Sequence, residues 1–149
     1  MRAVIQRVRH AAVHVDGREI AAIGQGLLVF VGLGQGDSEK DISYIVDKTL
    51  NLRVFEDQQA RMNLSVRDVN GEVLVVSQFT LYGDVRRGRR PSFTAAMPPD
   101  QARGLFDQVV QAFTTAFPAC KTGQFQAMMA VSLVNDGPVT ILLDSNKLF

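Results

Sequence analysis

The chain has 149 residues, of which 46% are hydrophobic and 21% charged, and its 16 Lys+Arg against 15 Asp+Glu give a formal net charge of +1. This length and composition are typical of one globular domain and exclude a disordered chain. A single cysteine excludes an internal disulfide and a cysteine-rich zinc site, and no apolar run is long enough to span a bilayer. We therefore expect one domain over residues 1–149, in the cytoplasm, with no secretory signal, metal or cofactor.

The first third of the chain predicts a hairpin, a strand and a helix. Residues 13–23 alternate as a β-hairpin with a tight Asp-Gly turn, and residues 27–33 form the apolar run of a buried strand. Ser38 begins a helix, with Asp41 three residues later as a weak capping box. Apolar side chains then recur at helical spacing, so this helix has one buried face.

The rest of the chain predicts more strands and one further helix. Strands are expected over residues 52–55 and 72–80, and the proline pair 98–99 opens a helix with a continuous apolar stripe. Residues 125–134 and 139–143 predict the last two strands. Strands outnumber helices, and from their lengths we infer that the early connections are too short for crossovers. We therefore predict an α+β fold with a mainly antiparallel sheet or partial barrel and two packed helices.

Positive charge is concentrated in the polar loop 83–91. Four arginines fall within five positions there: Arg86, Arg87, Arg89 and Arg90. Without them, 12 basic and 15 acidic residues remain, for a formal charge of −3. A local patch of this kind attracts a polyanion even when the net charge is near zero. The alternative is a loop that is simply solvated.

Several weaker signals favour ordinary structural roles. The glycines within residues 32–36 connect a strand to a helix, but a dinucleotide fingerprint would need glycine at Asp37, so a plain loop is favoured over a phosphate site. His10 and His14 lack further metal ligands. Cys120 has no histidine partner and predicts a free thiol rather than a nucleophile. No histidine lies near the polar motifs described next, which leaves a Ser–His–Asp triad little support.

Two polar segments interrupt apolar ones. Ser77-Gln78-Phe79-Thr80 follows a buried run directly, and polar groups at the end of a buried strand are often binding groups, although satisfying the turn backbone is an equal alternative. The second segment is Asn135-Asp136-Gly137-Pro138-Val139-Thr140. Glycine there permits a close approach by another group, and the Gly and Pro carbonyls remain free as acceptors. From spacing alone, an ordinary hairpin turn is the simpler interpretation.

Read together, the two segments resemble the signatures of the D-aminoacyl-tRNA deacylase family, enzymes that edit mischarged tRNA. The opening Met1-Arg2-Ala3-Val4-Ile5-Gln6-Arg7-Val8 is similar to the family's first strand, and the resemblance covers essentially the whole chain. One departure is Gln126, which stands where the family usually has glycine.

The resemblance implies a homodimer with active sites at the subunit interface. The strand end of one subunit would meet a cis Gly-Pro motif inserted from the other, with Arg7 holding that motif in place. The catalytic residues so assigned are Ser77, Gln78, Phe79 and Thr80. The substrate-binding residues so assigned are Arg7, Phe125, Met129, Gly137 and Pro138. The four loop arginines would contact the acceptor end of a D-aminoacyl-tRNA.

A mechanism follows from the needs of ester hydrolysis. Negative charge develops on the carbonyl oxygen, and we expect main-chain N–H groups near Phe79 and Thr80 to stabilise it. Thr80 has no apparent base to activate it, so we expect attack by water with help from the substrate's ribose 2′-hydroxyl. L substrates would clash with the rigid backbone of Gly137 and Pro138, whereas glycyl-tRNA, which lacks a side chain, would be accepted in part.

Other classes of protein remain open at this stage. A dimeric RNA-binding module without catalysis would account for the basic loop but not for the pair of motifs. A conventional serine or threonine hydrolase would act on small esters. A purely structural protein agrees with the composition and leaves the motifs unexplained.

Overall fold

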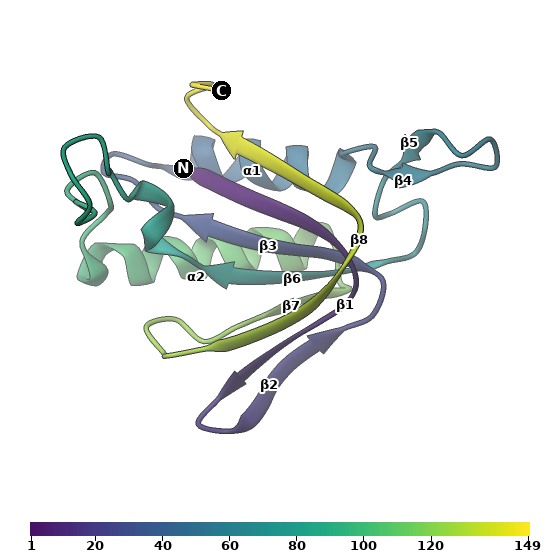
Figure 1. Cartoon of the computed structure of the whole chain (residues 1–149), viewed down its shortest axis with the longest axis horizontal. Coiled ribbons are helices and arrows are strands. Elements are labelled where there is room, and N and C mark those ends of the chain that lie inside the picture. Colours follow the sequence, from purple (N-terminus) through teal and green to yellow (C-terminus); the bar gives the residue numbers. More distant parts are fainter.

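A curled sheet with two helices packed on one face makes up the molecule (Figure 1). The computed structural model describes all residues, 1–149. The strands are β1 (Arg2–Val15), β2 (Arg18–Ile23), β3 (Gly26–Gly32), β4 (Phe55–Glu56), β5 (Met62–Leu64), β6 (Glu72–Ser77), β7 (Cys120–Thr122) and β8 (Ala130–Asp144). The helices are α1 (Glu39–Asn51), the 3-10 helix η1 (Phe79–Tyr82) and α2 (Pro99–Ala116). Neither α-helix is both long enough and apolar enough to cross a membrane.

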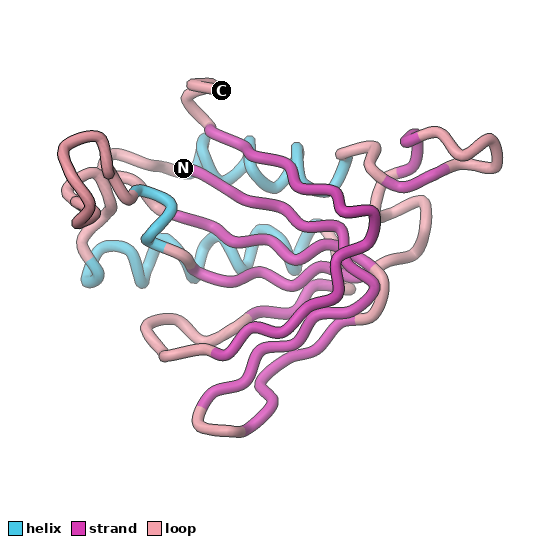
Figure 2. The backbone as a smooth tube through the Cα atoms, viewed as in Figure 1, coloured by secondary structure: helices cyan, strands magenta, loops and turns pink.

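The long strand β1 organises the sheet. Along one edge it pairs with β8, and along the other it pairs first with β3 and then with β2, which gives the strand order β2-β1-β3-β6-β7 with β8 beside β1. The strands bend together over their length, as Figure 2 shows, so that the sheet closes partly on itself. This agrees with the expected α+β class and partial barrel.

The sheet is mixed, so the expectation of a mainly antiparallel sheet holds only for the pairs that β1 makes. β3 and β6 are parallel, and so are β6 and β7. Parallel neighbours require a crossover connection. One crossover contains α1 and the small β4–β5 hairpin, and the other contains η1 and α2. The inference that the early connections are too short for crossovers is therefore wrong.

Apolar side chains are buried on both faces of the sheet. The larger cluster lies between the sheet and the helices, where Leu27 and Val29 of β3 meet Ile45 of α1 and Phe106 of α2. Alternate residues of the same strand point the other way, so Leu28 joins a smaller cluster inside the curl. Burial on both faces explains why β3 and β6 are continuous apolar runs in the sequence.

Both predicted helices are confirmed, with the expected ends. The N–H of Ser38 donates to Asp41 Oδ2 at 2.8 Å, which is half of the predicted capping box. α2 begins at Pro99, where a missing N–H costs nothing, and it ends two residues before Pro118. The hairpin formed by β1 and β2 and the buried strand β3 also lie where the sequence predicts them.

Strand boundaries in the second half differ from the prediction. The two strands expected at 125–134 and 139–143 are one strand, β8, and residues 125–129 form a loop. Asn135 to Thr140 is therefore not a hairpin turn. β1 pairs with both halves of β8, and two register shifts, between Gln6 and Val8 and between Val8 and His10, absorb the extra residues of β8. The predicted strand 52–55 is reduced to β4, and the short strand β7 was not predicted.

Candidate active site

An apolar pocket of about 1030 Å³ lies at the carboxyl ends of β3 and β6. Its floor includes Val31 and Val76, and its walls come from the start of α2, from residues 93–97 and from the loop 125–129. Most lining side chains are hydrophobic, and the few polar ones include Ser77 and Gln78. Apolar walls with a small number of polar groups are typical of a site for an organic ligand.

The chain turns sharply where β6 reaches the pocket. The predicted strand 72–80 stops at Ser77. The N–H of Gln78 still donates to the Val31 carbonyl of β3 at 2.8 Å, and the chain then coils into η1. The 3-10 turn closes when the N–H of Leu81 donates to the Gln78 carbonyl at 3.3 Å. The N–H groups of Phe79 and Thr80, at the first two positions of the helix, have no acceptor within it. The pocket edge therefore carries main-chain donors.

The Thr80 hydroxyl hydrogen-bonds to the side-chain amide of Gln78. An amide is not a base, so this neighbour cannot take the proton of the hydroxyl. Ser77, Gln78 and Phe79 line the pocket, whereas Thr80 is exposed beside it. This arrangement agrees with the sequence-based view that Thr80 lacks an activating base.

Aromatic side chains shape two sides of the pocket. Phe79 is 59% exposed, and its ring meets Phe93 edge-on with the ring centroids 5.0 Å apart. Phe125 stacks on Phe106 at 5.5 Å, and Met129 lies near it in the same wall. The structure thus brings the predicted residues Phe125 and Met129 to the pocket with Ser77, Gln78 and Phe79.

Gln126 adopts a left-handed backbone conformation, with φ +59°. Glycine is favoured in this region because other side chains crowd the backbone there. In this chain the Gln126 side chain is held from α2, where Arg103 Nη2 donates to Oε1 at 2.6 Å. The same guanidinium lies 5.1 Å from the Phe125 ring centroid. Arg103 therefore fixes the wall loop at the position where glycine was expected.

The second predicted motif lies elsewhere on the chain. Gly137 and Pro138 are exposed on β8, and their peptide bond is cis, as the resemblance implies. Neither residue lines the pocket, to which β8 contributes only Val131, near its start. Arg7 is only 6% exposed, and its Nε donates to the Asp136 carbonyl at 3.0 Å, next to the motif. A single copy of the chain does not bring the two motifs together.

Two main-chain hydrogen bonds between Asp84 and Ser92 hold the two ends of the arginine loop together. Arg86 is not free, because its Nε and Nη2 both bind the Asp84 carboxylate, at 2.9 and 2.7 Å. Hydrogen bonds from the Arg86 side chain and backbone lower the pKa of Asp84 to about 2. Arg87, Arg89 and Arg90 form no ion pair within the chain. They, rather than Arg86, provide the unpaired charge of the loop.

The glycine-rich stretch after β3 is a packing surface for η1. A Cβ on Gly34 would lie 2.5 Å from the Tyr82 hydroxyl, and a Cβ on Gly32 would lie 3.0 Å from the Gln78 carbonyl. Burial, and secondarily the nearby Asp37 carboxylate, raise the pKa of the Tyr82 phenol, so it stays neutral. These contacts favour the plain structural role of the glycines over a phosphate site.

Comparisons with known proteins identify the family of the chain. Residues 4–144 match the family model described as D-Tyr-tRNA(Tyr) deacylase. The chain belongs to this family. The D-aminoacyl-tRNA deacylases of Thermotoga petrophila and Halothermothrix orenii are 58% and 57% identical over 149 residues, with 100% of each chain covered. The family resemblance seen in the sequence is confirmed, and the chain is a hydrolase of the deacylase class.

Two solved structures share the fold. One, described as c-Myc DNA Unwinding Element Binding Protein, has a TM-score of 0.92 and 44% identity, and the match covers 97% of this chain and 98% of that chain. The other, described as a probable eukaryotic D-amino acid tRNA deacylase, has a TM-score of 0.81 at 17% identity and covers 95% and 97%. The second match shows that the same fold occurs at low sequence identity.

Some residues of the enzyme's pocket were not found by sequence reasoning. Phe93 and Met97 line it, and the loop that carries them is held when the Met97 N–H donates to the Leu33 carbonyl at 2.9 Å. The sequence signal that could have identified Phe93 is its place as an aromatic residue directly after a polar, arginine-rich loop. No group of three or more His, Cys, Asp or Glu side chains is placed to hold a metal ion.

Proposed function

We propose that this enzyme hydrolyses the ester bond that joins a D-amino acid to the terminal ribose of tRNA, and so acts in the cytoplasm in translation quality control. The products are the free D-amino acid and tRNA. The observation that carries the proposal is the start of η1 at the edge of the apolar pocket. It sets two main-chain donors, from Phe79 and Thr80, beside a space large enough for an aminoacylated nucleoside.

From the protein, the chemistry needs only main-chain groups, and the attacking nucleophile is a water molecule. As water attacks the ester, charge moves to the carbonyl oxygen, and the N–H groups of Phe79 and Thr80 stabilise it without having to reorganise. The proton of the attacking water is relayed through the substrate's own 2′-hydroxyl to the ribose 3′-oxygen. The ester bond to that oxygen breaks, and the tRNA leaves with a free 3′-hydroxyl. Thr80 is not the nucleophile, since its hydroxyl faces the amide of Gln78 and not a base.

A second copy of the chain completes the site. The Gly137–Pro138 motif is exposed and lines no part of its own pocket, so it is available to a partner's pocket. Val134 and Leu142 of β8 are also exposed, at 45% and 54%, and would be buried in a homodimer. The exposed apolar strand and the exposed motif thus have one common explanation.

Selection for D substrates then rests on main-chain geometry. The partner's Gly and Pro carbonyls accept hydrogen bonds from the substrate's α-ammonium group. With that group and the ester carbonyl both held, the side chain of an L-amino acid points into rigid backbone and is excluded. Glycine has no side chain to exclude, so glycyl-tRNA is hydrolysed to some extent.

The arginine loop binds the acceptor-end phosphates. It follows η1 directly, and Arg87, Arg89 and Arg90 are free to contact phosphate, whereas Arg86 must first leave Asp84. A charge reversal at Arg87 and Arg89 is expected to weaken tRNA binding and flatten its salt dependence.

The deciding experiment compares the deacylation of D-, L- and glycyl-tRNA by the purified enzyme and by Thr80→Val. We expect rapid release from D-aminoacyl-tRNA, slower release from glycyl-tRNA, and none from L-aminoacyl-tRNA. Thr80→Val should keep near-normal activity, because the hydroxyl takes no part in the chemistry. Efficient turnover of an L substrate would refute the proposed selection, and an inactive, folded Thr80→Val would refute the backbone mechanism.

A further inference from the structure

Arg2, near the start of β1, reaches across the sheet to the 3-10 helix of the site. Its Nη1 donates to the Leu81 carbonyl at 3.1 Å. Its guanidinium carbon lies 4.6 Å from the centroid of the Tyr82 ring. Two consecutive residues of η1 are therefore held by one side chain from a distant part of the sequence.

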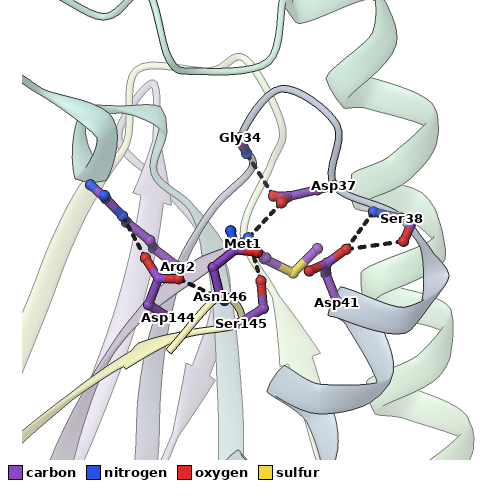
Figure 3. Close-up of polar contacts among 9 residues, drawn as sticks. All are labelled: Met1, Arg2, Gly34, Asp37, Ser38, Asp41, Asp144, Ser145 and Asn146. Atoms are coloured by element: carbon purple, nitrogen blue, oxygen red, sulfur yellow. Dashed lines mark hydrogen bonds and ion pairs between the residues drawn. The ribbon is translucent and has the colours of Figure 1, made fainter. Parts of the chain in front are cut away.

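The Nε atom of the same Arg2 guanidinium is bound to a buried carboxylate. Nε donates to Asp144 Oδ2 at 3.0 Å, and the Asp144 side chain is only 2% exposed. Asp144 also accepts the N–H of Asn146 at 2.7 Å, so its position does not depend on Arg2 alone (Figure 3). The guanidinium thus bridges a rigid carboxylate and the helix.

The start of β1 is anchored next to this bridge. Figure 3 shows the Met1 ammonium group between Asp37 and Ser145, to both of which it donates. Asp37 in turn accepts the N–H of Gly34 at 2.7 Å. Because Tyr82 packs on Gly34, the same cluster fixes both the base of Arg2 and the surface under the helix.

We propose that Arg2 is a positioning residue of the deacylase: by holding Leu81 and Tyr82 it keeps the N–H groups of Phe79 and Thr80 aimed at the substrate carbonyl. This rests on the proposed function of those N–H groups. A four-residue 3-10 helix has poor hydrogen-bond geometry and little stability of its own. Donors that stabilise a developing charge must be preorganised, so the helix requires an external support.

Only arginine can make the three contacts together. A guanidinium offers separate donors to Asp144 and to Leu81 while its plane covers an aromatic ring. A lysine has a single ammonium group, which can pair with Asp144 but cannot also reach Leu81 and cover Tyr82. Arg2→Lys is therefore the most informative variant, since it keeps the positive charge opposite the buried Asp144 carboxylate and removes the contacts with Leu81 and Tyr82 of η1.

The matched control is Arg67→Lys. Arg67 also lies over an aromatic ring, 5.5 Å from the centroid of Phe117, but it lines no part of the pocket. With D-aminoacyl-tRNA as substrate, we expect Arg2→Lys to lower kcat about tenfold with KM unchanged, the loss that corresponds to one charge-assisted hydrogen bond. Arg2→Met should lower kcat at least as much, and Arg67→Lys should behave as wild type. An unchanged kcat in folded Arg2→Lys would overturn the proposal.

Hydrogen exchange separates this proposal from the proposed function. The N–H groups of Leu81 and Gly83, which donate to Gln78 and Thr80, report the integrity of the helix. They should exchange faster in Arg2→Lys, while the amides of β3 and β6 stay as in wild type. Faster exchange spread evenly over the sheet would overturn the positioning role. If the wild-type enzyme fails to hydrolyse D-aminoacyl-tRNA, the proposed function is lost, and the exchange at these two amides still decides whether Arg2 holds the helix.

Discussion

The guanidinium of Arg7 leaves no room for a side chain at Gly137: a Cβ on that residue would lie 2.8 Å from Nη2. Arg7 is buried and fixed by the carbonyls of Asp136 and Val54, so it cannot easily move aside. Gly137 also has φ +123°, a conformation that L side chains rarely adopt. Close approach and backbone conformation both require glycine here.

We therefore expect Gly137→Ala to destabilise the protein by about 1–3 kcal/mol and to abolish most D-aminoacyl-tRNA deacylation. The methyl group clashes with Arg7 and shifts the motif that the partner subunit would use. Urea unfolding and a deacylation assay measure the two effects. A variant with wild-type activity would mean that the conformation at residue 137 is unimportant for the site.

Gly34→Ala tests how η1 is seated on the sheet. The new methyl group would lie 2.5 Å from the Tyr82 hydroxyl and 2.6 Å from its ring carbon, so the ring must move and η1 with it. We expect lower stability, by roughly 1–3 kcal/mol, and lower kcat. Thermal unfolding and steady-state kinetics give both values.

The control for this variant is Gly104→Ala. Gly104 lies within α2, and a Cβ there would have no neighbour within 4 Å. Alanine is the better helix former, so we expect a gain of about 0.5–1 kcal/mol and unchanged activity. Equal effects of the two alanines would argue against the packing of Tyr82 on Gly34.

Cys120 is expected to be a slow thiol. Burial raises its pKa to about 11, so at pH 8 it has on the order of a hundredfold less thiolate than an unperturbed cysteine. Its rate with a disulfide reagent should still rise about tenfold per pH unit up to pH 10, whereas a free thiol levels off near its pKa of about 8.5. Stopped-flow absorbance at several pH values measures this. Fast labelling of the native protein at pH 8 would contradict the raised pKa of this partly buried thiol.

Local patterns allowed the fold to be predicted where the chain forms structure with its neighbours in sequence. Ser38 with Asp41, and the prolines before α2, set helix ends through contacts within a few residues. The parallel pairing of β3 with β6 depends on contacts between distant segments. A continuous apolar run indicates burial on both faces, which is typical of parallel strands, but it does not identify the strand that pairs with it. The same reason hid the continuity of β8, because its pairing with β1 overrides the turn signal of Gly137 and Pro138.

The site was predicted in part for similar reasons. Ser77, Gln78 and Phe79 interrupt an apolar strand, which made them visible in the sequence, and they do line the pocket. Phe93 reaches the same pocket through a loop whose path no local pattern specifies. The pairing of Arg86 with Asp84 was also missed, since the loop was judged by its total charge and not by its internal contacts.

That pairing leads to the last prediction, which concerns tRNA affinity. In wild type, Asp84 accepts two side-chain bonds from Arg86, so a phosphate must displace a carboxylate to reach it. Asp84→Asn removes this competing charge and frees the guanidinium. We expect tighter tRNA binding at low salt, and a slope of log affinity against log salt that is steeper by about 0.7–0.9, the value for one added phosphate contact.

Filter binding over a series of salt concentrations measures the slope, and Arg87→Glu provides the opposite change. If Asp84→Asn leaves affinity and slope as in wild type while Arg87→Glu reduces both, Arg86 lies outside the tRNA contact; if neither variant changes them, the whole loop does.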